Sequence, residues 1–172
     1  MSQSATPADT VSDVQVLGDK LYEGHFAVTS VVEYGGSLQM VATGAAAVPL
    51  CGLRVDVGFE GPVSGRIDGT MRGTDHIQIR ADGRIELNVR GELTTHDGAK
   101  IAVEVGGVAV RQPTGRSLLR QHAKLTTADP AYVWVNALEI WATGIVDLAA
   151  GTIDVAAYLP RGEETMTEGV VL

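Results

Sequence analysis

The residues whose types and spacing best suit proton chemistry are two neighbours, Asp75 and His76. A carboxylate beside an imidazole at the end of a strand can tune or orient a general acid or base. Adjacent side chains of a strand point to opposite faces, so only one of the two can face an interior. The alternative is structural, with Asp75 capping a turn and His76 exposed to solvent. We take the pair as the first candidate for a proton carrier.

A second candidate is Arg54, which shares one face of the segment Leu53–Phe59 with Asp56. If the interior of the protein is apolar, both side chains face water, as charged strand residues usually do. If the mouth of a cavity receives them instead, the planar guanidinium of Arg54 can hold a ligand carboxylate, enolate or phenolate. Arg54 is therefore a candidate catalytic residue beside Asp75 and His76.

Aromatic side chains that suit ligand binding gather towards the C-terminus. Tyr132, Trp134 and Asn136 share one face if their segment is extended, offering two aromatic walls and an amide that donates and accepts hydrogen bonds. Trp141 is a further candidate for the same surface. This mixture suits an aromatic or polycyclic ligand. The alternative is core packing, with Asn136 satisfied by the backbone.

Several classes of function lack their sequence signals. The four histidines show no spacing typical of metal ligands, so we expect no metal, and no Walker loop, dinucleotide fingerprint or Gly-x-Ser-x-Gly elbow is present. The formal net charge is −8 and the arginines are scattered singly, which argues against a nucleic-acid partner. No apolar run approaches 18 residues, so no membrane span is expected.

Length and composition predict one domain with polar ends. The 172 residues suffice to bury a core, and we expect a domain over residues 14–160 between polar tails at 1–13 and 161–172. The N-terminus lacks a basic region followed by an apolar run, so no signal peptide is expected. The single cysteine, Cys51, cannot form an internal disulfide, which agrees with a cytoplasmic location. Its neighbours Leu50 and Leu53 indicate a buried thiol.

Strand-like alternation dominates the chain. In Arg84–Thr95 the apolar residues share one face and the charged residues share the other. Asp-Gly pairs at 82–83 and 97–98 are typical of tight hairpins and join this run to its neighbours on each side. The expected strands are His76–Arg80, Arg84–Thr95 and Lys100–Val105, which form a meander, and Leu21–Glu33, Leu38–Thr43, Leu53–Phe59, Gly65–Arg72, Ala123–Thr126, Val133–Thr143 and Thr152–Leu159.

Helical patterns are few. Thr114–His122 is too short to form a layer and is interpreted as a loop turn, while Asp129 before Pro130 permits a short helix over Pro130–Asn136. About eight to ten strands with so little helix must bury their apolar faces against each other. A closed or nearly closed antiparallel barrel is favoured over a sandwich because glycines recur within the strand patterns, as at barrel corners, namely Gly58, Gly61, Gly65, Gly69 and Gly73.

The stretches 58–75, 79–91, 96–101 and 127–136 together resemble a large bacterial and fungal family of uncharacterised small β-barrel proteins. The resemblance covers roughly Val48 to Tyr158. It implies a calycin-like barrel with a central apolar pocket, often a homodimer or small homo-oligomer, and no cofactor. Many relatives have a tryptophan at the position of His76, so this chain replaces a packing or stacking group with one of the residue type that can move protons.

Three functions remain open at this point. The first is a cofactor-independent enzyme that moves protons on an apolar or aromatic carbonyl compound, such as an isomerase, cyclase, dehydratase or lyase. The second is a non-catalytic carrier or sensor of a hydrophobic metabolite, and the third is a structural barrel filled by its own side chains. An ionisable group that meets a hydrogen-bond donor inside an open cavity would favour the enzyme.

Overall fold

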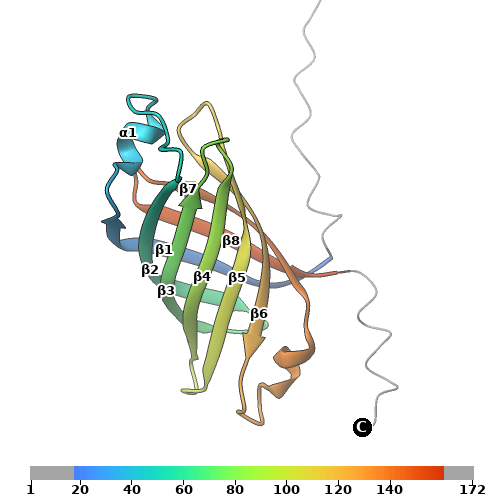
Figure 1. Cartoon of the computed structure of the whole chain (residues 1–172). Helices are drawn as coiled ribbons and strands as arrows, with labels where there is room; N and C mark the ends of the chain where they lie inside the picture. Colours follow the sequence, from blue (N-terminus) through green and yellow to red (C-terminus); the bar gives the residue numbers. More distant parts are fainter. Residues whose placement is uncertain (1–17, 161–172) are drawn as a thin grey trace, which may run out of the picture.

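The computed structural model describes residues 18–160, and its eight antiparallel strands close into a single barrel in sequence order (Figure 1). The all-β barrel expected from the sequence is confirmed. Two short helical turns interrupt the strands. In chain order the elements are β1 (Asp19–Glu33), α1 (Leu38–Ala42), β2 (Leu53–Gly65), β3 (Gly69–Ile79), β4 (Ile85–Thr95), β5 (Lys100–Arg111), β6 (Ser117–Thr126), η2 (Val133–Ala137), β7 (Ile140–Asp147) and β8 (Thr152–Leu159).

The expected meander is formed by β3, β4 and β5. Both of its turns place a glycine in the left-handed region, with φ of 86° at Gly83 and 91° at Gly98. Glycine adopts this conformation without the steric cost that a Cβ atom brings, which explains the Asp-Gly pairs. Along β4 every second side chain points inwards, and Leu87, Val89 and Leu93 are buried.

The barrel closes because β1 pairs with both β2 and β8. Close approach of neighbouring strands depends on glycine at two of the positions singled out in the sequence. A Cβ atom at Gly61 would collide with the backbone carbonyl oxygen of His25, and one at Gly69 would collide with that of Thr94. Because glycine allows the strands to approach and bend in this way, eight strands can close into a small barrel.

Two expected segments take a different structure. Leu38–Thr43 was expected as a strand but contains α1, because the Ser37 side chain caps the helix by accepting a hydrogen bond from the Met40 amide at 3.4 Å. Thr114–His122 was expected as a loop turn, but from Ser117 onwards it belongs to β6. Pairing with both β5 and β7 decides the structure there, which a local pattern does not show.

The prediction of a strand over Val133–Thr143 is correct only for its second half. Its first part is the 3₁₀ helix η2, in agreement with the alternative of a short helix after Asp129, and β7 begins only at Ile140.

Three further expectations concern the rest of the chain. The Cys51 thiol, expected to be buried, is exposed. Within residues 18–160 no helix is long and apolar enough to span a membrane. The expected tails, 1–13 and 161–172, lie outside the described residues.

The interior differs between the two ends of the barrel. At the η2 end the side chains pack tightly, and Leu93, Ile101 and Val135 are completely buried. At the other end, which α1 covers, the inward side chains surround an open space. Figure 1 shows α1 and η2 at opposite ends of the strands. The barrel is therefore filled at one end and hollow at the other.

Candidate functional site

The hollow end contains a cavity of about 110 Å³ whose walls are mostly aliphatic and aromatic. Phe26 and Phe59 form part of the wall, with ring centroids 5.2 Å apart. Most of the remaining lining residues are Val, Leu, Ile and Ala. A concave apolar space with a few polar groups is typical of small-molecule sites. The polar side chains of the lining are Tyr22, Asp75, Arg111, Ser117 and Gln121.

Asp75 is the acidic group of this lining. It lies on the inner face of β3, and its Oδ1 accepts a hydrogen bond of 2.9 Å from the backbone amide of Asn88. Burial among apolar side chains raises the pKa of the Asp75 carboxyl to about 6, although the Asn88 hydrogen bond acts in the opposite direction. Its Oδ2 accepts no hydrogen bond from residues 18–160. One carboxyl oxygen is thus available to a ligand.

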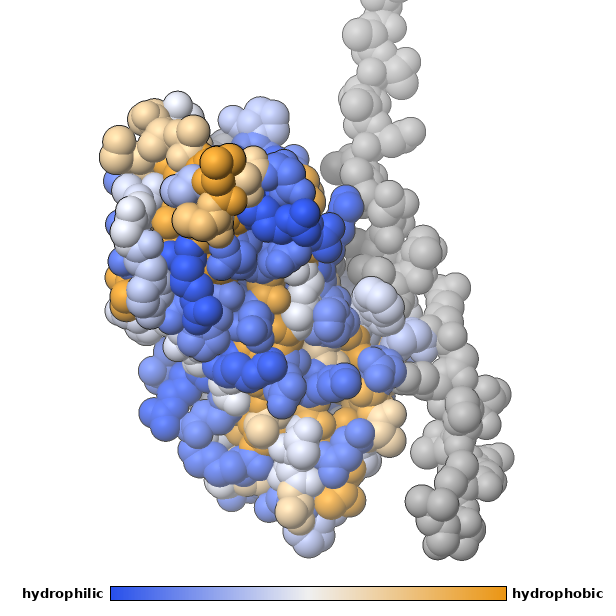
Figure 2. Space-filling view, in the orientation of Figure 1, coloured by the Kyte–Doolittle hydropathy of each residue, from blue (hydrophilic) through white to orange (hydrophobic). Residues whose placement is uncertain are grey.

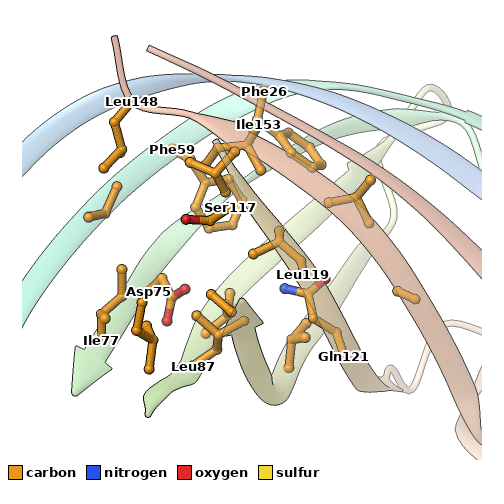
Figure 3. Close-up of a pocket in the computed structure, with 18 of the residues that line it drawn as sticks. Phe26, Phe59, Asp75, Ile77, Leu87, Ser117, Leu119, Gln121, Leu148 and Ile153 are labelled. Atoms are coloured by element: carbon orange, nitrogen blue, oxygen red, sulfur yellow. The ribbon is translucent and has the colours of Figure 1, made fainter. Parts of the chain in front are cut away.

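Gln121 lies on β6, three strands away from β3 in the eight-stranded barrel. Figure 3 shows its side-chain amide and the Asp75 carboxyl entering the same space from different walls. The residue is buried, and its amide has no hydrogen-bond partner within the described part of the chain. Leaving a buried polar group unpaired costs about 1–3 kcal/mol. A ligand with a carbonyl or hydroxyl group would remove that cost.

The phenol of Tyr22 also lines the cavity without a hydrogen bond to any described residue. The side chain is buried, and burial raises the pKa of the phenol to about 12. Tyr22 therefore stays neutral at physiological pH and can act as a hydrogen-bond donor. The cavity thus holds an amide and a neutral phenol without the partners that buried polar groups normally have, and a carboxyl group with one free oxygen.

The α1 end of the cavity is its mouth. Leu38 and Ala42 of α1 line it, and Leu148 of the turn between β7 and β8 lines it as well. Large apolar side chains are exposed next to the mouth, namely Met40 on α1 and Leu50 in the segment that follows α1. Figure 2 shows this end as a cluster of hydrophobic surface above a largely hydrophilic barrel wall.

His76 and Arg54 lie outside the barrel, so neither lines the cavity. His76 Nδ1 is 3.0 Å from the Asp56 carboxylate and 3.0 Å from Arg54 Nη2. Arg54 Nε and the Tyr34 hydroxyl also donate to Asp56, each at 3.0 Å. These hydrogen bonds lower the pKa of the Asp56 carboxyl, with that to His76 contributing most. If the interior is apolar, Arg54 and Asp56 were expected on the outer face of the barrel, and the structure places them there.

The aromatic candidates near the C-terminus are also away from the cavity. The hydroxyl of Tyr132 donates to the Asp97 carboxylate at 3.0 Å, and the Trp134 ring lies beneath the Arg66 guanidinium, 5.2 Å from its centre. Asn136 hydrogen bonds the backbone of Thr127 through both Oδ1 and Nδ2, each at 2.8 Å. These contacts hold η2 across the packed end.

Trp141, the remaining candidate, lies on the outer face of β7 with 54% of its surface exposed. Of the catalytic and ligand-binding candidates put first in the sequence, only Asp75 therefore lines the cavity. Tyr22, a second-rank candidate for an inward-facing residue in the sequence, also lines it, whereas sequence reasoning missed Gln121, Ser117 and Arg111. A signal for Gln121 was present, because it stands on the same face as Leu119, Ala123 and Leu125 in an alternating run. The interpretation of that run as a loop turn concealed it.

The chemistry open to this cavity is that of a base and hydrogen-bond donors in an apolar enclosure. A carboxyl group with a pKa near 6 changes its charge close to neutral pH. The Gln121 amide can donate to an oxygen that gains negative charge on the ligand. Across residues 18–160, no three His, Cys, Asp or Glu side chains gather in a way that would hold a metal ion.

The chain resembles a family of unknown function and several solved barrels. The profile of the family described as "Protein of unknown function (DUF3237)" matches residues 53–158. A β-barrel-like protein from Acinetobacter baumannii superposes with a TM-score of 0.66 at 18% identity, covering 82% of this chain and 93% of the other. A protein of unknown function from Clostridium acetobutylicum gives 0.67 at 19% identity, covering 82% and 96%.

A fungal structure shares the fold as well. It is described as an enzyme from Penicillium herquei and superposes with a TM-score of 0.56 at 19% identity, covering 81% of this chain and 91% of the other. No match was found among curated proteins. At these identities the likeness establishes the barrel, which agrees with the resemblance noted in the sequence.

Proposed function

The chain belongs to the DUF3237 family of proteins of unknown function, and from its cavity we propose that it is a cofactor-independent enzyme that moves a proton on a small, largely apolar or aromatic carbonyl compound. The reaction would be an isomerisation, cyclisation, dehydration or lyase cleavage. The observation that carries the proposal is the Asp75 carboxyl, which lies in an apolar cavity with a pKa of about 6. The homodimer and the cytoplasmic location remain predictions from the sequence.

In the proposed reaction Asp75 acts first as a base. Its carboxylate takes a proton from the carbon next to the substrate carbonyl, and the electron pair of that C–H bond moves to the carbonyl oxygen to give an enolate. The protonated Asp75 then returns the proton to another carbon, which completes an isomerisation, or to a leaving oxygen, which completes a dehydration. A carboxyl with a pKa near the working pH is suited to both steps.

Gln121 supplies the second function. Its amide N–H donates to the enolate oxygen, on which negative charge develops during proton removal. The support for this role is its burial in the cavity wall without another partner among the described residues. Donors aimed at developing charge in a site shielded from water typically contribute about 10²–10³ in rate. Phe26 and Phe59 would form part of the apolar surface against which the substrate packs.

Hydrogen–deuterium exchange tests this proposal without knowledge of the natural substrate. The protein is incubated in D₂O with a panel of apolar ketones, such as phenylacetone and 2-tetralone, and deuterium uptake beside the carbonyl is followed by NMR. We expect catalysed exchange above the buffer rate for at least one compound. The rate should rise with pH around a midpoint near 6, because only the ionised Asp75 can accept the proton.

The apolar lining alone would also serve the alternative function, a carrier or sensor of a hydrophobic metabolite. The same panel separates the two functions. A carrier would bind apolar ketones, as shown by an increase in melting temperature, and would leave their exchange at the buffer rate. Binding of the ketones without exchange across the panel would therefore contradict the enzyme and support the carrier. A rate that falls as the pH rises through 6 would contradict the role of Asp75 as a base.

A further inference from the structure

Two charged side chains are present in the described lining of the cavity, and they have opposite signs. Asp75 is the acid described above, and Arg111, at the end of β5, is the cation. Arg111 lies at the mouth, where its Nη1 donates to the backbone carbonyl oxygens of Val41 and Ala42 at 3.0 and 3.2 Å. These two hydrogen bonds connect the mouth of the barrel to the last turn of α1.

The charge of Arg111 is not neutralised by a carboxylate. No Asp or Glu of residues 18–160 forms an ion pair with it, whereas its neighbour Arg116 is paired with Asp147 at 3.0 Å. The Nε and Nη2 groups of Arg111 have no hydrogen-bond acceptor in the described part of the chain. Arg111 is exposed at the mouth, so these donors are open to a ligand that enters the cavity.

Ser117 stands directly beside Arg111. The two residues are opposite each other in the pairing of β5 with β6, and both line the cavity. Directly opposed residues of antiparallel strands have their Cβ atoms about 5 Å apart. Figure 3 shows the Ser117 hydroxyl inside the cavity, and the described residues give it no hydrogen-bond partner. A guanidinium and a hydroxyl side by side form a two-donor site for an oxyanion.

From this arrangement we propose that the ligand is an amphipathic anion. Its carboxylate or similar oxyanion binds Arg111 and Ser117 at the mouth, and its apolar body extends into the barrel towards Asp75 and Gln121. The inference rests on the proposed function for the role of Asp75, and it narrows the substrate to apolar carbonyl compounds that also carry an acidic group. Arg111 is then a residue that determines specificity, because a neutral ligand of the same shape gains nothing from it.

Two fluorescent probes that differ by one anionic group test the inference. They are 1-anilinonaphthalene-8-sulfonate and its uncharged analogue N-phenyl-1-naphthylamine, and their dissociation constants are measured for the native protein, Arg111→Gln and Ser117→Ala. We expect Arg111→Gln to weaken binding of the sulfonate about tenfold and to change binding of the neutral probe less than about twofold. Ser117→Ala should weaken sulfonate binding by a smaller factor. Salt at about 0.5 M should weaken only sulfonate binding.

Arg116→Gln is the matched control, since it removes a nearby cation that is already paired and does not line the cavity. It should leave the affinity for both probes unchanged. Arg111→Lys keeps the positive charge and should retain part of the preference for the sulfonate, which separates a role of the charge from a role in holding α1. Melting curves of all variants show whether each one folds.

Equal weakening of both probes by Arg111→Gln would overturn the inference, because Arg111 would then act only by holding α1. An unchanged affinity for the sulfonate would overturn it as well. Either result would leave the proposed function intact if the neutral probe binds and ketone exchange proceeds. Failure of both probes to bind the native protein would count against the cavity as a binding site, and so against the proposed function too.

Discussion

Asp75→Asn is expected to reduce catalysed ketone exchange by at least about 100-fold, because the amide cannot accept the proton that the carboxylate takes. The substitution keeps the shape of the side chain, and the new Oδ1 can still accept the hydrogen bond from the Asn88 amide. The cavity should therefore survive, and the neutral probe should bind with unchanged affinity. The measurement is the exchange rate at pH 8, where Asp75 in the native protein is ionised.

His76→Gln is the matched control for this prediction. It changes the adjacent residue, whose side chain lies outside the barrel against Asp56 and Arg54. We expect its exchange rate at pH 8 to stay within about twofold of the native rate, since no side chain that lines the cavity is replaced. The reverse pattern, with exchange lost in His76→Gln and kept in Asp75→Asn, would identify His76 as the proton carrier and contradict the proposed mechanism.

Asp75→Asn should also stabilise the fold at alkaline pH. The pKa of Asp75 is about 6 in the folded protein against an ordinary value of 3.8, so the folded state holds the proton more tightly than the unfolded chain. The free energy of unfolding therefore falls as the pH rises from about 4 to about 6 and loses no more above that range. A shift of this size corresponds to about 3 kcal/mol, and because Asp75 is only partly buried we expect an effect of about 2 kcal/mol.

Denaturant unfolding of both proteins at pH 4 and pH 8 measures this effect. Asp75→Asn should be more stable than the native protein by about 2 kcal/mol at pH 8 and nearly equal to it at pH 4. A residue that costs stability and is required for activity is a common feature of active sites. A variant that is less stable at both pH values would show that the Asp75 carboxylate stabilises the barrel.

The second large effect concerns two leucines on the inner face of β4. Leu93→Ala should cost about 3–4 kcal/mol, because Leu93 is completely buried in the packed end and its removal leaves a cavity. Leu87→Ala should cost only about 1–2 kcal/mol, because Leu87 borders a cavity that already exists, so one side of it already faces empty space. Urea unfolding of both variants measures the difference.

The two leucines should also differ in their effect on binding. Leu87→Ala enlarges the cavity and should favour bulkier probes over smaller ones, whereas Leu93→Ala should leave the order of affinities unchanged. Equal losses of stability in the two variants would show that the mouth end is as tightly packed as the η2 end. That result would contradict the conclusion that the barrel is hollow at its α1 end, on which the proposed function depends.

Most of the fold could be predicted from the sequence because its signals are local. The alternation in β4 and the Asp-Gly turns at Gly83 and Gly98 specify a meander without reference to the rest of the chain. One error falls where distant contacts decide the structure, because Ser117 and the residues after it form β6 between β5 and β7. The other error is local, since α1 replaces an expected strand through the cap that Ser37 provides three residues before Met40.

The candidate site was predicted less well than the fold. Alternation shows that Asp75 and His76 face opposite ways, but it does not show which of them faces inwards. The pairing of β3 with β2 and β4 decides this and turns Asp75 into the cavity. Gln121 was missed because its strand was interpreted as a loop turn, and Arg111 was missed because its importance depends on the empty space beside it. No spacing of residue types in a sequence reports an empty space.

The packed end of the barrel has a consequence for the kinetics of any ligand. In the described part of the chain, η2 closes that end with Val135 buried beneath it, and the cavity reaches the surface beside α1. Substrate and product must use this entrance in turn, so the product has to depart before the next substrate can enter. For the proposed enzyme, departure of the product past α1 and Arg111 would therefore limit turnover once the chemistry at Asp75 is faster than that departure.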